Sequence, residues 1–197
     1  MTLNELVNEV INITKRVDLQ SETQSAVIAA TLKAHSSDYF FRDLVELAVQ
    51  FDAPRYIQTF YPKSISALYR QVKYMRIWNG DVTGDAGDFL EHMQIEAALD
   101  NYGYIRTNVF YMAGQFLQIR ATAKLDKILF GFYQFPNVVP VSYSSWIAAD
   151  YPWAIIYEAA RTVFLITGYQ EQSASMRSLV QEQYATLKIS NVDTIPT

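Results

Sequence analysis

The sequence of 197 residues contains no cysteine, and this absence excludes several classes of site. Without thiols there is no disulfide framework, no thiolate zinc site and no cysteine nucleophile. No stretch reaches the roughly 18 apolar residues of a membrane-spanning helix. The opening residues, MTLNELVNEV, lack the basic and apolar segments of a signal peptide. We therefore expect a protein that is made and folded in the cytoplasm and has no membrane partner.

The familiar catalytic motifs are missing as well. The sequence contains no G-x-x-x-x-G-K-[ST], G-x-G-x-x-G, G-x-S-x-G or H-E-x-x-H pattern. Residues 79–88, NGDVTGDAGD, approach a calcium-binding loop, but Leu90 stands where the motif needs a glutamate. The two histidines, His35 and His92, leave open a Ser-His-Asp triad whose members are distant in sequence. We expect no enzyme activity, no cofactor and no metal site.

The sequence also lacks an excess of basic residues, and this weighs against tight binding of nucleic acids. The net charge is −4 and the isoelectric point is near 5.2. The densest basic set, Arg70, Lys73 and Arg76, alternates with apolar residues. Proteins that bind phosphates tightly concentrate lysine and arginine on one surface. Contact with DNA that passes without being held remains compatible with this balance.

Aromatic residues, in contrast, are abundant. They make up 14% of the chain, with 14 tyrosines and 11 phenylalanines. Tyrosine suits surfaces that are wet in one state and apolar in another, as at subunit interfaces. A tyrosine-rich core explains the same count equally well.

Local signals predict helices at both ends of the chain. Thr2 and Glu5 form a capping box, and apolar residues at helical spacing follow. Pro152 stands at a favoured first helical position, with Asp150 as a possible cap, and Gly168 ends the same stripe. The predicted helices are 2–16, 21–36, 152–167 and 172–187.

The middle of the chain, 43–135, has the texture of strands. Candidate strands are 44–51, 55–62 and 68–78, a turn is predicted at 52–54, and a short helix at 89–103. A β-meander follows in VFYMAGQFLQIRA (109–121) and ILFGFYQF (128–135). Leu117, Ile119 and Ala121 alternate with polar residues, but 128–135 is apolar on both faces.

The order helices, strands, helices predicts an α+β fold. We expect an antiparallel β-meander and hairpins inserted between the helices, and an extended C-terminal tail. In this scheme residues 1–187 form a single domain and residues 188–197 a flexible tail.

Several stretches together resemble the head-to-tail adaptor (connector) proteins of tailed bacteriophages, particularly those of short-tailed phages. The resemblance covers most of the chain and is one of order and texture. It is carried by DYFFRDLVEL (38–47), YMRIW (74–78), residues 87–136 and residues 145–183.

The resemblance implies a helical bundle core into which the β-elements are inserted. It also implies a structural protein of the virion at the head–tail junction. Such adaptors form a ring of identical subunits, usually twelve-fold, that docks under the portal protein and extends the DNA channel. The ring provides an attachment surface for a tail or nozzle protein, and genomic DNA passes through it without sequence-specific binding. Two alternatives stay open, a peptidoglycan-degrading virion hydrolase that uses paired carboxylates (Glu91/Glu96 or Asp85/Asp88) and a generic oligomeric binding module.

A meander with two apolar faces suggests where such a ring would be held together. One face can pack on the chain's own helices and the other on the next subunit, in a contact that closes on itself. The residues predicted at this subunit interface are Tyr111, Phe116, Phe130, Phe132 and Tyr133. Docking on the portal is predicted for the tail, at Lys188, Ile189, Val192 and Ile195.

Overall fold

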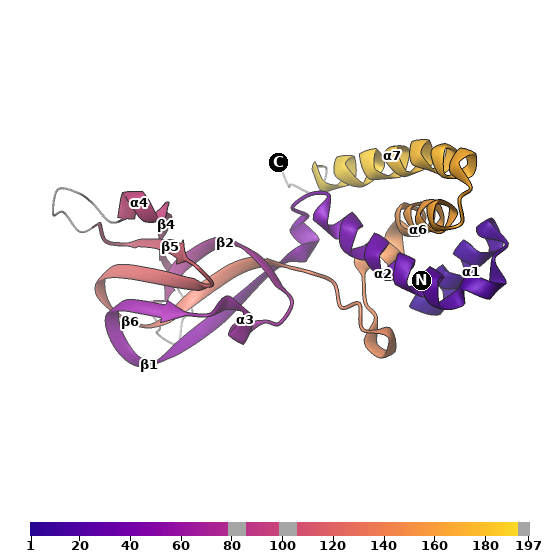
Figure 1. Cartoon of the computed structure of the whole chain (residues 1–197). Helices are drawn as coiled ribbons and strands as arrows, with labels where there is room; N and C mark the ends of the chain where they lie inside the picture. Colours follow the sequence, from indigo (N-terminus) through magenta and orange to yellow (C-terminus); the bar gives the residue numbers. More distant parts are fainter. Residues whose placement is uncertain (79–85, 99–105, 193–197) are drawn as a thin grey trace. The chain divides into compact units, whose positions relative to one another are not determined.

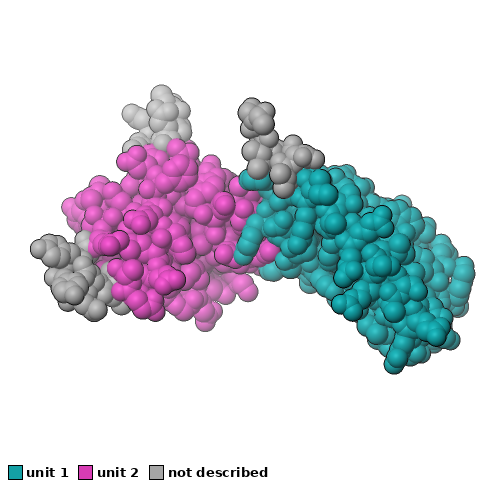
Figure 2. Space-filling view, turned by 90° about the horizontal axis from the view of Figure 1, so that it is seen from above, with its two compact units in different colours: residues 1–43, 135–197 teal, residues 44–134 magenta. Residues whose placement is uncertain are grey.

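The computed structural model describes residues 1–78, 86–98 and 106–192 (Figure 1). The chain divides into two compact units, coloured separately in Figure 2. The helical unit consists of residues 1–43 and the part of the chain from Phe135 on, and the sheet unit of residues 44–134. Each unit has its own cluster of buried apolar side chains.

The ends of the helices follow the local signals of the sequence. The Thr2 hydroxyl accepts a hydrogen bond from the Glu5 backbone, and the Glu5 carboxylate accepts one from the Thr2 N–H at 2.8 Å, so the predicted capping box is confirmed. Gly168, with φ of 81°, follows the last turn of the helix that starts at Pro152. The helices of this unit are α1 (Leu3–Thr14), α2 (Gln20–Ser36), α5 (Trp146–Asp150), α6 (Pro152–Ile166) and α7 (Gln170–Val192), with 3₁₀ helices η1 (Val17–Leu19), η2 (Phe41–Asp43) and η3 (Pro140–Ser142).

Helix α6 lies at the centre of the helical unit, where α1, α2 and α7 all pack against it (Figure 1). Small side chains at Ala154, Ala159 and Ala160 are fully buried and allow these helices to approach closely. One carboxylate is buried among them: Glu158 of α6 accepts hydrogen bonds from Lys33 of α2 at 2.6 Å and from Arg161 at 2.8 Å.

The sheet unit is built around one long strand. Strand β6 pairs with β1 along one edge and with both β2 and β5 along the other. Its elements are β1 (Leu44–Phe60), α3 (Pro62–Ile65), β2 (Tyr69–Trp78), β3 (Ala86–Phe89), β4 (Glu91–His92), α4 (Ile95–Ala98), β5 (Val109–Ala113) and β6 (Phe116–Gln134).

The sheet curls until it is nearly closed, like a barrel. Strand β3 pairs with β2, and β4 pairs with β5, so the chain from β3 to β4 bridges the two strands on the same edge of β6. The Leu90 N–H donates to the Met75 carbonyl at 2.9 Å and links this bridge to β2. The enclosed space is filled by side chains that are completely buried, among them Met75, Leu117, Ile119, Ile128, Phe130 and Phe132.

The expected helical bundle core is therefore wrong, although the fold is α+β as predicted. The sheet is not a projection from the helices, because it encloses an apolar core of its own. The predicted turn at 52–54 is an irregularity inside β1, where the register against β6 shifts between Gln50 and Ile57. The Asp-Ala-Pro sequence lies in this irregular stretch, and β1 continues through it.

Two further expectations are corrected in part. The range 89–103 holds the end of β3, β4 and the short α4 in place of one helix, and residues 99–103 lie outside the described part of the chain. The C-terminal tail does not begin at 188, because α7 continues to Val192. Residues 193–197 also lie outside the described part.

Candidate functional site

Most of the predicted interface residues lie inside the sheet unit. Phe130 and Phe132 have no exposed surface, and Tyr111 and Tyr133 are 2% and 4% exposed. Phe130 stacks on Phe132 with ring centroids 4.6 Å apart. These four side chains are buried in the core of the sheet unit in the single chain, and their part in a subunit interface stays a prediction. Phe116 is 48% exposed and stays a predicted contact.

The residues predicted to dock on the portal lie at the end of α7. Lys188 and Ile189 are exposed, and α7 ends at Val192. Asn191 ties this end to the segment that follows α2, because its side chain accepts from the Phe41 N–H at 3.1 Å and donates to the Tyr39 carbonyl at 3.3 Å. Ile195 lies outside the described residues, and docking at this end stays a prediction.

The outer face of β2 and β3 carries aromatic rings paired with cations. Tyr74, Arg76 and Trp78 alternate with the buried Met75, so they share the side of the sheet that faces away from its core. The Arg76 guanidinium lies 4.7 Å from the centre of the Phe89 ring, and the Lys127 ammonium lies 4.6 Å from that of Trp78. We call Tyr74, Arg76, Trp78, Phe89 and Lys127 the aromatic face.

Tyr74 at the centre of this face is held on three sides. Its hydroxyl donates to the Glu46 carboxylate at 2.7 Å, and its ring meets Phe89 edge-on at 5.6 Å. The ring also covers Gly131 of β6, where a Cβ would come within 2.5 Å of it. Burial, together with the hydrogen bond to Glu46 and its charge, raises the pKa of Tyr74 to about 12, so the hydroxyl remains a donor.

A second surface feature is a loop of the helical unit, residues 137–144, which we call the projecting loop; it is the orange loop below the helices in Figure 1. The Ser144 N–H donates to the Asn137 carbonyl at 2.8 Å, and the Asn137 side chain accepts from the Val139 N–H at 3.1 Å and donates to the Ser142 hydroxyl at 3.0 Å. These bonds order the loop from within. Its tip nevertheless presents apolar side chains, since Val139 is 55% and Val141 98% exposed.

The base of the projecting loop is anchored by a buried polar network that sequence reasoning missed. Ser145, directly after the loop, bonds His35 Nε2 at 2.9 Å, and His35 Nδ1 bonds both carboxylate oxygens of Asp43 at 2.9 Å. The Trp146 indole donates to Asp43 at 2.7 Å, and the Tyr143 hydroxyl pairs with Thr31 at 2.8 Å. His35 and Asp43 lie eight residues apart, but no local pattern points to a serine 110 residues further on.

Ser145, His35 and Asp43 have the connectivity of a catalytic triad. The surroundings indicate an anchoring role instead. His35 is 1% exposed and Asp43 6%, and the Ser145 hydroxyl also accepts from the Ala148 N–H as the cap of α5. A cavity of about 60 Å³ lies nearby, but Ser145 is not among its lining residues. The network fixes the end of α2, η2 and the start of α5 relative to one another.

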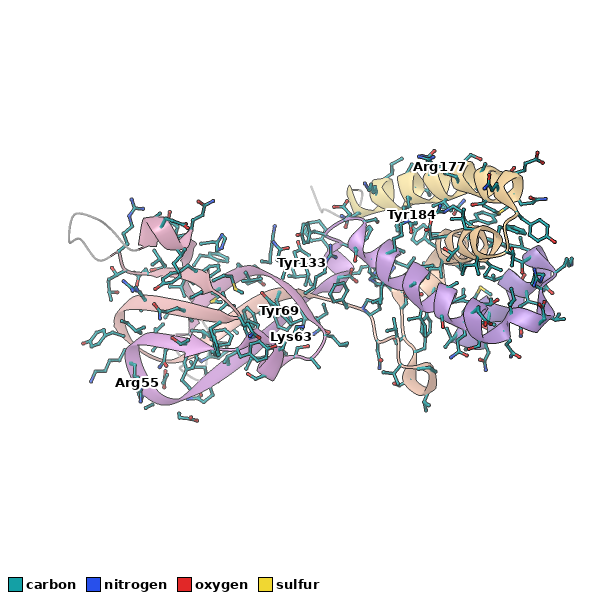
Figure 3. The ribbon with its side chains drawn as sticks, in the orientation of Figure 1. Arg55, Lys63, Tyr69, Tyr133, Arg177 and Tyr184 are labelled. Carbon is teal, nitrogen blue, oxygen red and sulfur yellow. The ribbon has the colours of Figure 1, made fainter. Side chains whose placement is uncertain are left out.

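The sheet unit also has an open groove of about 620 Å³ between β2 and the β4–α4 segment. Its lining is of mixed character, with Arg70, Lys73, His92 and Glu96 beside apolar side chains. Tyr69, labelled in Figure 3, also lines the groove. Its ring stacks on Phe130, and its hydroxyl accepts from the Val72 N–H at 3.0 Å.

The described residues contain no group of three or more His, Asp or Glu side chains that could hold a metal ion. Glu91 and Glu96 are both exposed, and Asp85 and the calcium-like stretch up to it fall outside the described part. Among the helices that the structure describes, none is long and apolar enough to cross a bilayer.

Comparison of the chain with protein-family models and with curated proteins gave no match.

Proposed function

We propose that the protein is a virion structural protein, the subunit of a head-to-tail adaptor ring of a tailed bacteriophage. The ring docks under the portal, extends the DNA channel and offers a surface to the tail or nozzle. The observation that carries the proposal is the projecting loop, which holds Val141 almost wholly in solvent on an ordered scaffold.

An exposed apolar tip on an ordered loop is suited to insertion into a partner. Solvent-exposed valine gains free energy when it is buried, at about 25 cal/mol per Å². A loop already fixed by internal hydrogen bonds and by the network at its base loses little conformational entropy on binding. Both terms favour a role in assembly over a role in chemistry.

The distribution of charge fits a channel through which DNA passes. The helical unit has 11 acidic and 7 basic residues, and the sheet unit has 9 of each, so the net charge of −4 belongs to the helical unit. A ring built from such subunits lacks the excess of lysine and arginine that holds phosphates.

Assembly on the portal tests the proposal. The full-length chain is mixed with the portal protein encoded in the same genome, and the mass of the product is measured by light scattering. We expect the chain alone to be monomeric or weakly associated and to form a ring on the portal. A stable dimer that does not bind the portal protein contradicts the proposal.

The Val141→Asp variant examines the observation that carries the proposal. It should fold normally and lose assembly, because a carboxylate at the tip cannot be buried without a partner. Val17→Asp is the matched control, since Val17 is also exposed, at 76%, and lies on η1 of the same unit. If Val141→Asp and Val17→Asp form rings in equal yield, the projecting loop is not part of the contact.

A further inference from the structure

The aromatic face is a second exposed surface, and the ring proposal above does not account for it. Phe89 is 62% exposed, with Tyr74 and Arg76 of the neighbouring β2 against its ring. Lys127 of β6 lies over the ring of Trp78 on the same β2. Tryptophan, tyrosine and arginine are the residue types that most often dominate the binding energy of protein interfaces. Four of the five residues predicted at the subunit interface are buried, so this outer face is a further candidate, beside Phe116, for a contact of the sheet unit.

The side chains of the face are ordered before any partner arrives. Tyr74 is fixed by Gly131 beneath it and by Glu46 beside it. Arg76 is held over Phe89 and donates from Nε to the Gly87 carbonyl at 3.3 Å, and Lys127 is held over Trp78. Long side chains that are already in place lose less entropy on binding. The face is therefore built for contact with a surface of defined chemistry.

Charge identifies that chemistry. The face presents two cations, Arg76 and Lys127, beside one carboxylate, Glu46, on a unit whose net charge is zero. The helical unit carries the excess of acidic residues, and three of its exposed carboxylates have no hydrogen-bond or ion-pair partner in the described part of the chain. They are Glu22, Glu171 and Glu182.

We infer that the aromatic face of one copy binds the acidic helical unit of a second copy. This inference rests on the proposed function, because it names the two surfaces that meet in the ring. The contact joins different surfaces of identical chains, so each copy has one of each kind to offer. Such heterologous contacts form rings when the rotation between copies closes, and complementary charge sets the orientation of the partners.

Photo-crosslinking from Phe89 tests the inference directly. A photoreactive phenylalanine analogue replaces Phe89 in full-length chain of natural isotope composition, which is mixed with heavy-isotope-labelled wild-type chain and assembled on portal. We expect mass spectrometry to find heavy peptides from 1–43 or 135–192 joined to the light chain. The same analogue at Tyr56, an exposed aromatic residue of β1, is the control and should give few such products.

A charge reversal gives a second readout. Lys127→Glu should lower ring yield on the order of tenfold, because it sets a carboxylate against an acidic partner surface. Lys124→Glu is the matched control, since Lys124 also lies over an aromatic ring, that of Tyr56, but outside the aromatic face.

The outcomes separate the two proposals. The inference is wrong if rings form but Phe89 crosslinks only to residues 44–134. It is also wrong if Lys127→Glu and Lys124→Glu change the ring yield equally. Neither outcome contradicts the proposed adaptor ring. A wild-type chain that forms no ring on portal overturns both.

Discussion

The ring of Tyr74 lies directly over Gly131, and a Cβ at that glycine would come within 2.5 Å of the tyrosine Cζ. This contact explains why a strand as apolar as β6 has a glycine between Phe130 and Phe132. It also shows how the second face of that strand is covered, since the cover comes from the sheet unit's own aromatic side chain.

Gly131→Ala should displace the Tyr74 ring and destabilise the sheet unit by about 1–3 kcal/mol, as overpacking does. Chemical denaturation followed by tyrosine and tryptophan fluorescence measures the loss. The control is the same substitution in a Tyr74→Ala chain, where the obstructing ring is absent and the penalty should nearly vanish. An equal penalty in both chains contradicts the proposed clash.

Phe132→Ala should lower the free energy of unfolding by about 3–5 kcal/mol, because Phe132 is fully buried between Phe130 and Tyr69. The melting temperature of the monomer measures it. Phe116→Ala, at an exposed site of the same strand, should change the melting temperature little. If Phe132→Ala melts at the same temperature as the wild type, the Phe132 side chain is not part of the core.

Ser145→Ala should destabilise the helical unit by about 1–3 kcal/mol, because it removes the cap of α5 and leaves His35 Nε2 without its partner. Ser144→Ala changes the neighbouring exposed hydroxyl and should be close to neutral. Hydrogen exchange at α5 and η2 reports where the loss occurs. Exchange that rises equally in both variants argues against the anchoring role of Ser145.

The buried carboxylate of Glu158 should make stability depend on acid. Burial by itself would raise its pKa, but the hydrogen bonds and charges of Arg161 and Lys33 together hold the pKa below the ordinary 4.5. A carboxylate with a lowered pKa stabilises the fold above its unfolded pKa, and that contribution is lost as the pH falls through its folded pKa.

Unfolding curves between neutral pH and about pH 3 should therefore show a steeper loss of stability for the wild type than for Glu158→Gln. Glu182→Gln, on the exposed side of α7, should leave the slope of the wild type unchanged. If the free energy of unfolding falls with pH equally in the wild type, Glu158→Gln and Glu182→Gln, Glu158 is not the source of the pH dependence.

The sequence predicted best those features that are encoded locally. Such features depend on a few neighbouring residues. They are the capping box of Thr2 and Glu5, the start of α6 at Pro152 and its end before Gly168. The alternation of Leu117 and Ile119 placed both in the core for the same reason.

Contacts between distant segments were beyond such signals. The Asp-Ala-Pro stretch predicted a turn, but pairing with β6 on both sides of it keeps β1 continuous through an irregular stretch. The closure of the sheet depends on Leu90 meeting Met75, and the anchor of the projecting loop on Ser145 meeting His35. None of these pairs has a periodicity that a single sequence reveals.

The pairing of Leu44 with Tyr133 at the ends of β1 and β6 has a consequence for how this gene can change. The chain enters and leaves the sheet unit at neighbouring points, so the unit is a cassette inserted between Asp43 and Phe135. Recombination can exchange such a cassette without altering the path of the helices. One half of the molecule can thus diversify to meet a new partner while the other keeps its sequence.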